Sequence, residues 1–417
     1  MPDDLSLMFE QVLERLEGDH GKGLVQNALC LIASSRSGLL ESELLELLAR
    51  ENEIQLPRAF WARLYRALEL YLRPPGESGE GALDFYFKQL RDAVHARYFR
   101  EKRVEIAYQR ELADFYRMKM NFIGSFNQNA SSNLRTTIRV VQACKKFLEL
   151  GAKHSKRLKG RTIRFVSEVN PRAVEMAPYH QLMGRQWLYL EQSLTNLRFV
   201  EEKCRLGMTY ELISDYMLFD ERLEELRTEV TPVIEDQEED EETDIYSKPS
   251  DVAIDRITQF MKFVRRQSHI LSTEPSMVFQ LAHNEPDSTA PARNARSRVR
   301  VGINQRSWLE YINKPQESDH CLMTIVGHSS FVWAVCPSPD GKIILSACWD
   351  GKLKQWDSST GLDRGTLVAH TANVRCCAFS PDGKLAASGG GDWIVRIWDM
   401  KSSSELCSFP GHTDVIW

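Results

Sequence analysis

Residues 327–357 read GHSSFVWAVCPSPDGKIILSACWDGKLKQWD, and residues 369–399 read AHTANVRCCAFSPDGKLAASGGGDWIVRIWD. The two stretches align without a gap at an offset of 42 residues. They share a His, a Ser-Pro-Asp-Gly-Lys run, a Ser, an Asp and a closing Trp-Asp pair. A third copy starts with Gly-His at residue 411 and reaches residue 417. A fixed period of this length is typical of repeat architectures, in which each copy forms one small unit that packs on its neighbours.

Each copy predicts three short antiparallel strands. In the first copy the apolar residues are concentrated in 331–336, 343–348 and 352–356. Residues 339–341, Pro-Asp-Gly, predict the first turn, because Pro presets φ and Gly accepts a positive φ. Residues 350–351, Asp-Gly, predict the second turn. We therefore expect an all-β region at the C-terminal end of the chain.

These repeats resemble the WD40 family, whose members form β-propellers. In that family a His, a Ser or Thr, an Asp and a Trp of each repeat commonly form a hydrogen-bonded tetrad. The resemblance assigns this role to eight residues: His328, Ser346, Asp350, Trp356, His370, Ser388, Asp392 and Trp398. A His, a Ser and an Asp together also occur in hydrolytic sites. Because the set recurs once per repeat, we favour blade stabilisation, in which the tetrad supplies the partners that a buried carboxylate needs.

The number of copies predicts an incomplete propeller. Propellers have about four to eight blades, whereas residues 320–417 hold two complete copies and the start of a third. We therefore expect these residues to form part of a propeller, and the chain to be a fragment or a truncated gene model.

The residues upstream of the repeats have mainly helical periodicity. Apolar residues recur at helical spacing through 1–118. One interruption, where two apolar segments flank the Gly- and Pro-rich residues 74–81, is typical of a β-wing. We therefore expect a winged-helix-like helical domain over 1–118, a second helical domain over 172–234 and a helical segment over 251–286. The predicted fold class is multi-domain α+β.

Charged and polar stretches separate these helical regions. Residues 119–171 are expected to be a basic insertion or loop, since 135–172 carry eleven Lys and Arg against two Glu. An alternative is that 135–172 contact an RNA backbone, although few aromatic residues are present for base stacking. Residues 235–250 are expected to be an acidic linker. Residues 287–319, with two Pro and several Arg, are expected to be a second linker.

Composition narrows the class of protein. The chain has 417 residues and a net charge of -5, which excludes a wholesale polyanion binder. It has no apolar run of about 18 residues and no basic-then-apolar leader, so we predict neither a membrane span nor a signal peptide. Its nine cysteines contain no CxxC pair and predict neither a disulfide framework nor a zinc site. We therefore expect a cytoplasmic protein without metal or cofactor.

Several upstream stretches resemble NACHT and WD40 repeat-containing proteins, which are STAND-type signal-transduction ATPases that include telomerase-protein-component-like members. The resemblance is to the region between their nucleotide-binding module and their propeller, and it rests on the order of the stretches ahead of the WD40 repeats. The stretches are SLMFEQVLERL (6–16), DFYFKQLRDAV (84–94), PYHQL (178–182), FMKFVRRQSH (260–269) and FQLAHN (279–284).

Two departures from that family affect the prediction of function. A phosphate loop needs G-x-x-x-x-G-K-[ST], so that backbone amides, a Lys and a hydroxyl hold phosphate and magnesium. Residues 21–23 and 383–385 contain Gly-Lys, but neither has the hydroxyl residue after the Lys. In addition, Phe87 stands where relatives often carry a nucleotide-sensing His. The nucleotide-binding module is therefore missing from this sequence.

We accordingly predict a non-catalytic scaffold or regulatory segment whose WD40 blades dock protein partners. No residue is expected to be catalytic, and His180, His269 and His283 are interpreted as structural histidines because they lack ligand spacing. One alternative is a part of a nucleotide-dependent ATPase switch whose motor lies outside this chain. A second is the RNA-binding module that the basic stretch suggests. The nature of the protein partner is left open.

Overall fold

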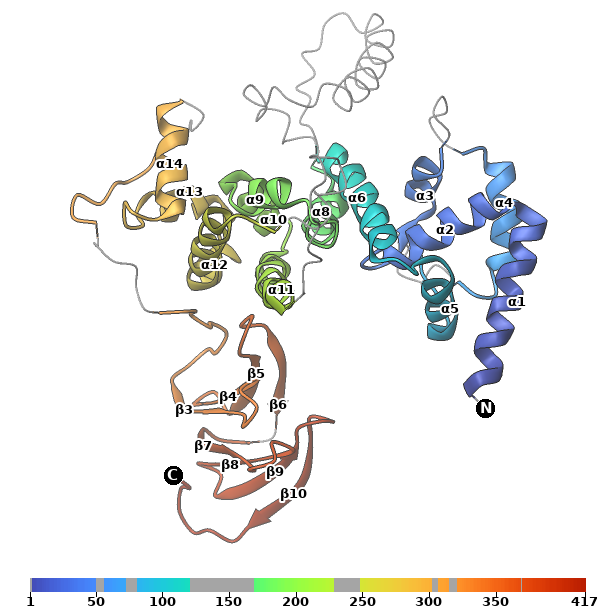
Figure 1. The fold of residues 1–417 in the computed structure, drawn as a ribbon. Helices are drawn as coiled ribbons and strands as arrows, with labels where there is room; N and C mark the ends of the chain where they lie inside the picture. Colours follow the sequence, from blue (N-terminus) through green and yellow to red (C-terminus); the bar gives the residue numbers. More distant parts are fainter. Residues whose placement is uncertain are drawn as a thin grey trace, which may run out of the picture. The chain divides into compact units, whose positions relative to one another are not determined.

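The computed structural model describes residues 2–49, 56–72, 81–120, 169–228, 248–301, 307–314, 321–368 and 370–417. The chain divides into two compact units, Met1–Arg185 and Gln186–Trp417. In Figure 1 the first unit runs from blue to green and the second from green to red.

The first unit is built from helices around an apolar core. Leu13, Leu29, Trp61 and Leu112 are among its fully buried side chains. They lie on the apolar faces that helical spacing places toward the interior, which confirms the predicted helical N-terminal region. The helices are α1 (Pro2–His20), α2 (Lys22–Ser34), α3 (Glu41–Leu47), α4 (Arg58–Leu68), α5 (Lys88–Tyr98), α6 (Lys102–Lys119) and α8 (Pro171–Met183).

A small antiparallel sheet joins separate parts of this unit. Strand β1 (Leu39–Leu40) pairs with β2 (Ala82–Leu83). Farther along, Leu72 forms an isolated antiparallel bridge with Phe85. The two apolar segments of the predicted wing therefore lie alongside each other at their base. Residues 73–80, which include nearly all of the predicted tip, lie outside the described residues.

Helix α8 differs from the sequence expectation in its placement. The sequence groups residues 172–234 together, whereas α8 packs against α6 in the first unit and the second unit begins at Gln186. Apolar side chains on several sides of α8 are buried, Val174, Met176 and Leu182 among them. A helix that is buried on most sides needs neighbours on each of them, and the apolar pattern alone does not say which helices these are.

The second unit begins with a group of helices. Lys203 of α10 and Asp215 of α11 form an ion pair inside it, and both side chains are buried. A buried charge needs such a partner, because desolvation of an unpaired ion is costly. The helices are α9 (Trp187–Leu194), α10 (Leu197–Arg205), α11 (Thr209–Thr228), α12 (Asp251–Leu271), α13 (Val278–His283) and α14 (Ala290–Arg300), with a 3-10 turn η2 at Pro275–Met277.

Helix α14 corrects the expected linker at 287–319. Eleven of these residues form a helix instead of a linker. Pro291 lies in the first turn, where its missing N–H removes no hydrogen bond and its fixed φ suits a helix. Ala290, Ala292 and Ala295 are buried. Pro and Arg residues are common in linkers, but the several Ala residues with a Pro in the first turn favour a helix.

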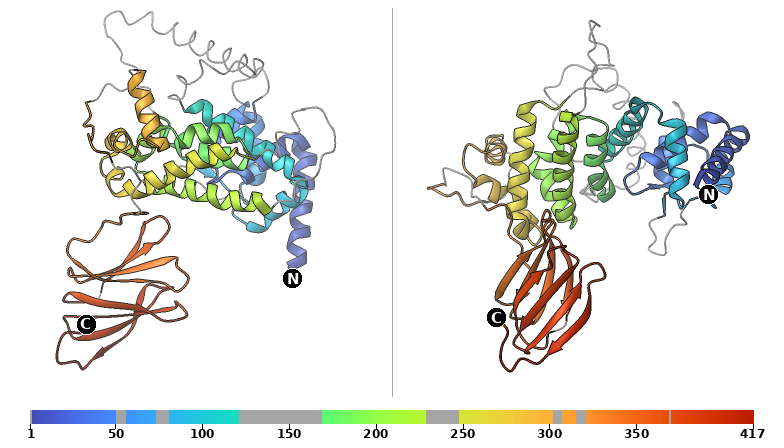
Figure 2. Two further views of the ribbon diagram at one scale, coloured as in Figure 1. Left: turned by 60° about the vertical axis from the view of Figure 1, so that its left-hand side comes forward. Right: turned by 60° about the horizontal axis from the view of Figure 1, so that its bottom comes forward.

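The C-terminal residues form two four-stranded antiparallel blades. The left view of Figure 2 shows the two sheets lying one over the other. In each blade neighbouring strands are consecutive in sequence. The predicted repeat strands and the predicted incomplete all-β propeller are thereby confirmed. The first blade holds β3 (Val332–Pro337), β4 (Ile343–Cys348), β5 (Lys352–Asp357) and β6 (Asp363–Val368), and the second holds β7 (Val374–Phe379), β8 (Leu385–Gly390), β9 (Ile394–Asp399) and β10 (Ser404–Pro410).

The fourth strand of each blade was not predicted, because the sequence repeat is out of phase with the blade by one strand. β6 precedes His370 of the second repeat in sequence, yet it pairs with β5 of the first. β10 likewise precedes His412 and pairs with β9. The equivalent residues 321–326 of the first repeat form no strand, since the described residues include no earlier blade to pair with.

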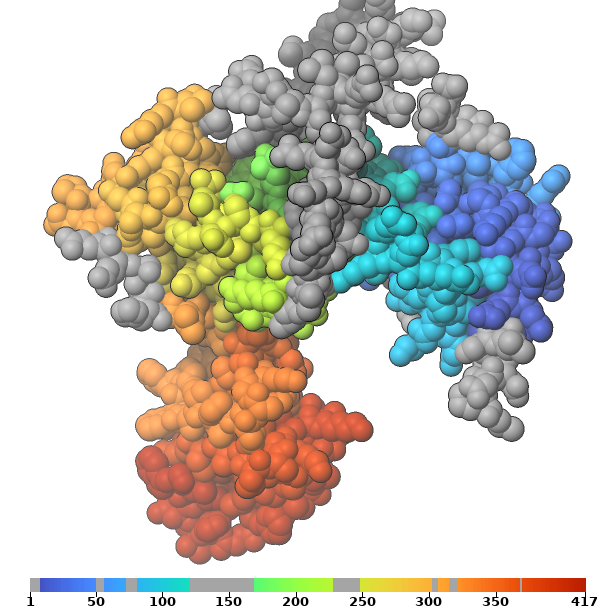
Figure 3. Space-filling view, in the orientation of Figure 1, coloured from blue at the N-terminus to red at the C-terminus, as the bar shows by residue number. Residues whose placement is uncertain are grey.

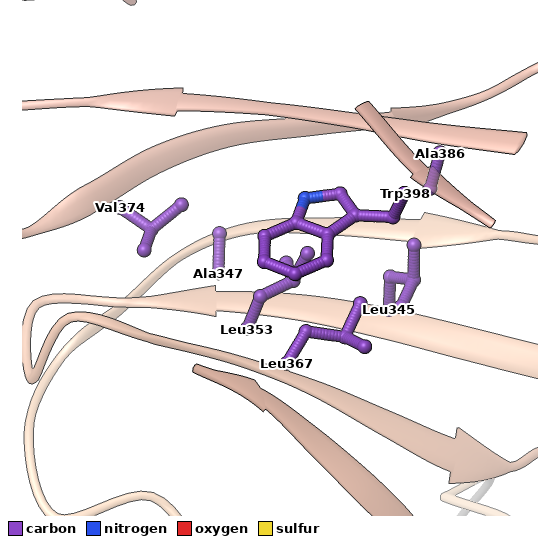
Figure 4. Close-up of a cluster of buried hydrophobic side chains, with 7 residues drawn as sticks. All are labelled: Leu345, Ala347, Leu353, Leu367, Val374, Ala386 and Trp398. Carbon is purple, nitrogen blue, oxygen red and sulfur yellow. The ribbon is translucent and has the colours of Figure 1, made fainter. Parts of the chain in front are cut away.

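An apolar core joins the two blades. In the space-filling view their atoms are in contact along the shared boundary (Figure 3). In Figure 4 the indole of Trp398 lies among side chains of both blades. Burial of apolar area is the main source of such stability. The core consists of Leu345, Ala347, Leu353 and Leu367 from the first blade and Val374, Ala386 and Trp398 from the second.

Candidate functional site

The first repeat brings together three of its four predicted tetrad residues by hydrogen bonds. Trp356 Nε1 donates to Ser346 Oγ over 2.7 Å, and this oxygen lies 2.6 Å from His328 Nε2. His328 Nδ1 is 3.6 Å from Asp350 Oδ2, which is beyond hydrogen-bond reach. Asp350 instead accepts from the hydroxyl of Ser329 over 3.0 Å.

In the second repeat all four predicted tetrad residues are within hydrogen-bond distance of one another in a chain. Trp398 Nε1 donates to Ser388 Oγ over 2.9 Å, and this oxygen lies 2.7 Å from His370 Nε2. Because an indole N–H can only donate, Ser388 is free to donate its own proton to His370. His370 Nδ1 lies 2.9 Å from Asp392 Oδ1 and also 2.9 Å from Arg396 Nη1. Arg396 Nη1 donates to the other oxygen of Asp392 over 2.7 Å.

Burial and hydrogen bonding fix the charges of these groups. Burial disfavours both carboxylates, but hydrogen bonds from Cys348 to Asp350 and from His370 to Asp392 help to outweigh it, so both Asp pKa values are lowered. Burial lowers the pKa of His328 and of His370, against the opposite effect of their Asp neighbours. The histidines are therefore neutral and the aspartates ionised near neutral pH.

This arrangement suits stabilisation better than hydrolysis. A nucleophilic Ser needs a base and an open approach for the substrate. Ser346 and Ser388 are only 5% and 3% exposed, and each accepts a hydrogen bond from an indole. Each hydroxyl therefore holds a Trp and a His of its own repeat together.

The first repeat also offers donor atoms of the kinds that zinc takes. A ring nitrogen of His328, Cys348 Sγ and a carboxylate oxygen of Asp350 lie within 4.8 Å of one another. Nitrogen, thiolate and carboxylate are all ligands of Zn²⁺. Gly390 holds the place of Cys348 in the second repeat, so the repeat fold does not require the thiol.

Sequence reasoning missed a cluster of surface residues at the blades. Trp333, Trp349, Arg375 and Trp417 are in contact with one another, and the three indoles are exposed. The repeat contained a usable signal, since residues 333, 375 and 417 are each 42 apart. No periodic pattern, however, would have added Trp349, whose counterpart in the second repeat is Gly391.

The other histidines considered in the sequence do not form a shared site. His180 Nδ1 lies 2.7 Å from Gln109 Oε1 in the first unit. His283 lies in the second unit beside Trp308 and Phe279. His269 is near the end of α12 and its ring nitrogen Nδ1 is buried without a hydrogen bond.

The predicted charged segments fall mostly outside the described residues. Residues 121–168 and 229–247 are not described, which covers most of the basic stretch and most of the expected acidic linker at 235–250. Arg172, the last basic residue of the 135–172 stretch, is described. Its Nε donates to both carboxylate oxygens of Glu43 over 2.9 and 3.0 Å, so this guanidinium is engaged within the first unit.

A known family matches most of the residues that form the two blades. The family described as "WD domain, G-beta repeat" matches residues 319–357 and 362–399. This confirms that the chain carries WD40 repeats. Among solved structures, "Structure of U3-55K" is 30% identical with a TM-score of 0.22, and covers 22% of this chain and 30% of that one.

Three curated relatives extend the similarity. Apoptotic protease-activating factor 1 of Danio rerio is 27% identical over 189 residues, which is 45% of this chain and 13% of the relative. NACHT domain- and WD repeat-containing protein 1 of Homo sapiens is 33% identical over 126 residues, or 25% of this chain and 8% of the relative. Telomerase protein component 1 of Rattus norvegicus is 23% identical over 362 residues, which is 82% of this chain and 11% of the relative.

The chain therefore spans only about a tenth of the length of these relatives, by the shares of 13%, 8% and 11%. Their similarity agrees with the predicted relation to NACHT and WD-repeat proteins. Among the described helices, none combines the length and the apolar character that a bilayer span requires.

Proposed function

We propose that this chain is a non-catalytic protein-interaction scaffold from a NACHT- and WD40-type signalling protein, acting in the cytoplasm. The WD40 match and the similarity to NACHT domain- and WD repeat-containing protein 1 support the assignment. The absence of a phosphate loop from the sequence supports a role without nucleotide hydrolysis. All eight described cysteines are free thiols, as suits a reducing compartment.

One observation carries the proposal: in each blade the tetrad Ser is held between its His and its Trp, while large aromatic side chains stand at the surface. Ser388, for example, is held between His370 and Trp398. Trp333 and Trp393 are by contrast about half exposed. Rigid blades that display exposed aromatic residues are suited to binding a partner surface.

The test is affinity capture of binding partners from cytosolic extract with the intact chain and two variants. Trp398→Ala removes the centre of the core between the blades, whereas Leu29→Ala opens a smaller cavity in the core of the first unit. Partners that dock on the blades should be lost with Trp398→Ala and retained with Leu29→Ala. Loss of every partner with Leu29→Ala alone, or no partner that depends on the blades, would contradict the proposal.

A nucleotide-switch function makes a different prediction for the same chain. If residues of this chain completed a nucleotide site, the purified protein would bind or hydrolyse ATP. We expect neither, because the sequence lacks the phosphate-loop motif G-x-x-x-x-G-K-[ST]. Saturable ATP binding in an equilibrium assay would overturn the non-catalytic assignment.

A further inference from the structure

Three residues at the same place in successive repeats meet at the surface of the blades. Trp333, Arg375 and Trp417 are spaced by 42 residues. A shift in the register of β3 against β4 leaves Trp333 out of the ladder, and the same shift of β7 against β8 leaves Arg375 out. Such bulges re-aim the side chain of the extra residue. Because β3 and β7 are neighbours, the re-aimed side chains converge.

The converging side chains form an aromatic cage around a guanidinium. The Cζ atom of Arg375 is 3.8 Å from the ring centroid of Trp417, 5.4 Å from that of Trp333 and 5.5 Å from that of Trp349. The rings of Trp333 and Trp349 are 5.7 Å apart, and those of Trp333 and Trp417 are 6.4 Å apart. All three distances from the cation lie within the range of cation–π attraction.

The caged guanidinium differs from the other arginines of the blades by lacking a carboxylate. Arg364 pairs with Asp357 over 2.5 Å and Arg396 with Asp392 over 2.7 Å. Arg375 forms no ion pair within the described part of the chain, and its Nε and Nη1 are buried without a hydrogen-bond acceptor. A guanidinium has five N–H donors, and buried donors without an acceptor are costly. The cage therefore holds a cation that has no carboxylate partner among the described residues.

The indoles that surround this cation are exposed. Trp417 is 76% exposed, Trp333 48% and Trp349 45%. Exposed clusters of large apolar side chains mark interaction sites, and Trp and Arg are the residues that most often dominate binding energy in interfaces.

We propose that this cluster, the Arg375 cage, is a docking site for an acidic peptide segment of a partner protein. A Glu or Asp side chain of the partner pairs with the Arg375 guanidinium, and apolar residues beside that acid cover the indoles of Trp333 and Trp417. A carboxylate matches the fork of an arginine in charge and in geometry. This site rests on the proposed scaffold function and specifies where the blades bind and what they recognise.

The charge of the blades favours a peptide over a nucleic acid. Residues 321–417 carry eight Lys and Arg against nine Asp and Glu. A phosphate backbone is bound by several cations that together release its counterions. Here one unpaired guanidinium stands among indoles, which suits a single carboxylate with apolar neighbours.

The test is selection of a random peptide library displayed on phage against the intact chain. Selected peptides should carry Glu or Asp next to an aromatic or aliphatic residue, and should bind Arg375→Ala about tenfold more weakly or worse. Arg364→Ala is the matched control, because Arg364 is a blade arginine that already has its carboxylate. It should leave binding unchanged. Arg375→Lys keeps the charge but loses the planar fork, and should recover only part of the affinity.

Several outcomes would overturn the site. These are a library that yields no binder, selected peptides without acids, affinity that is indifferent to Arg375→Ala, and tighter binding of a single-stranded uridine oligonucleotide than of the peptides. Hydrogen exchange in β7 to β9 should match between the parent and Arg375→Ala, which separates a lost contact from a lost fold. If blade-dependent partners persist with Arg375→Ala, the scaffold function stands and only this site fails.

Discussion

His180 shows at the scale of one residue how much the surroundings of a side chain escape sequence analysis. Its ring is buried in α8, lies 2.7 Å from Gln109 Oε1 and stacks on Tyr116. Burial, together with Arg36 and Arg172, lowers its pKa to about 3. The sequence indicated a structural His from its lack of ligand spacing. It could not indicate these partners, because α6 contributes two of them from about 70 residues away.

The lowered pKa predicts acid destabilisation of the first unit. An unfolded His takes up a proton near pH 6.5, whereas folded His180 does so near 3. Between these values the unfolded chain binds more protons, so stability is lost as the pH falls, at about 1.4 kcal/mol per pH unit. His180→Gln should flatten this dependence. Urea unfolding monitored by hydrogen exchange in α6 and α8, at pH 6.5 and pH 5, measures it, and equal losses in both proteins would refute the assignment.

At the scale of the element, local sequence signals predict the first three strands of each blade. The fourth strand and helix α14 depend on contacts with residues distant in sequence, so they were not predicted. β4 and its turns follow from Pro-Asp-Gly and Asp-Gly chemistry inside one repeat. β6 depends on pairing with the strand of an earlier repeat, so its own residues carried too little signal. Helix α14 was not predicted for another reason. Its Pro and Arg residues are also common in linkers, and the burial of its alanines, which the sequence does not show, distinguishes a packed helix from a linker.

Packing between the blades predicts the cost of losing one side chain of β4. Leu345 is fully buried in the shared core, and a buried Leu→Ala change typically costs about 2–5 kcal/mol through lost transfer energy and the cavity. Leu362→Ala is the matched control, since Leu362 is 45% exposed. Chemical denaturation of both variants, followed by the strand signal in circular dichroism, should show the loss for Leu345→Ala alone. Equal effects would mean that this core does not hold the blades.

At the scale of the molecule, the repeat was visible in the sequence because the same contacts recur every 42 residues. The division into units was not, since α8 is separated from α6 by a long undescribed stretch and still packs on it. The Arg375 cage belongs to the same class of feature. Trp333, Arg375 and Trp417 share a repeat position, but pairing of β3 with β4 places Trp349 beside Trp333, and only the packing of β7 on β3 brings Arg375 to both.

Separate cores predict that the two units lose structure independently. The buried core of the first unit includes Leu29 of α2, and the core between the blades includes Leu345 of β4. In the intact chain, Leu29→Ala should speed hydrogen exchange in peptides of α1 to α8 and leave those of β3 to β10 unchanged. Leu345→Ala should do the reverse, because local opening follows the stability of each cooperative unit. If either substitution accelerated exchange in both groups of peptides, the chain would unfold as one body, and the blades could not keep their docking surface while the helical unit opens.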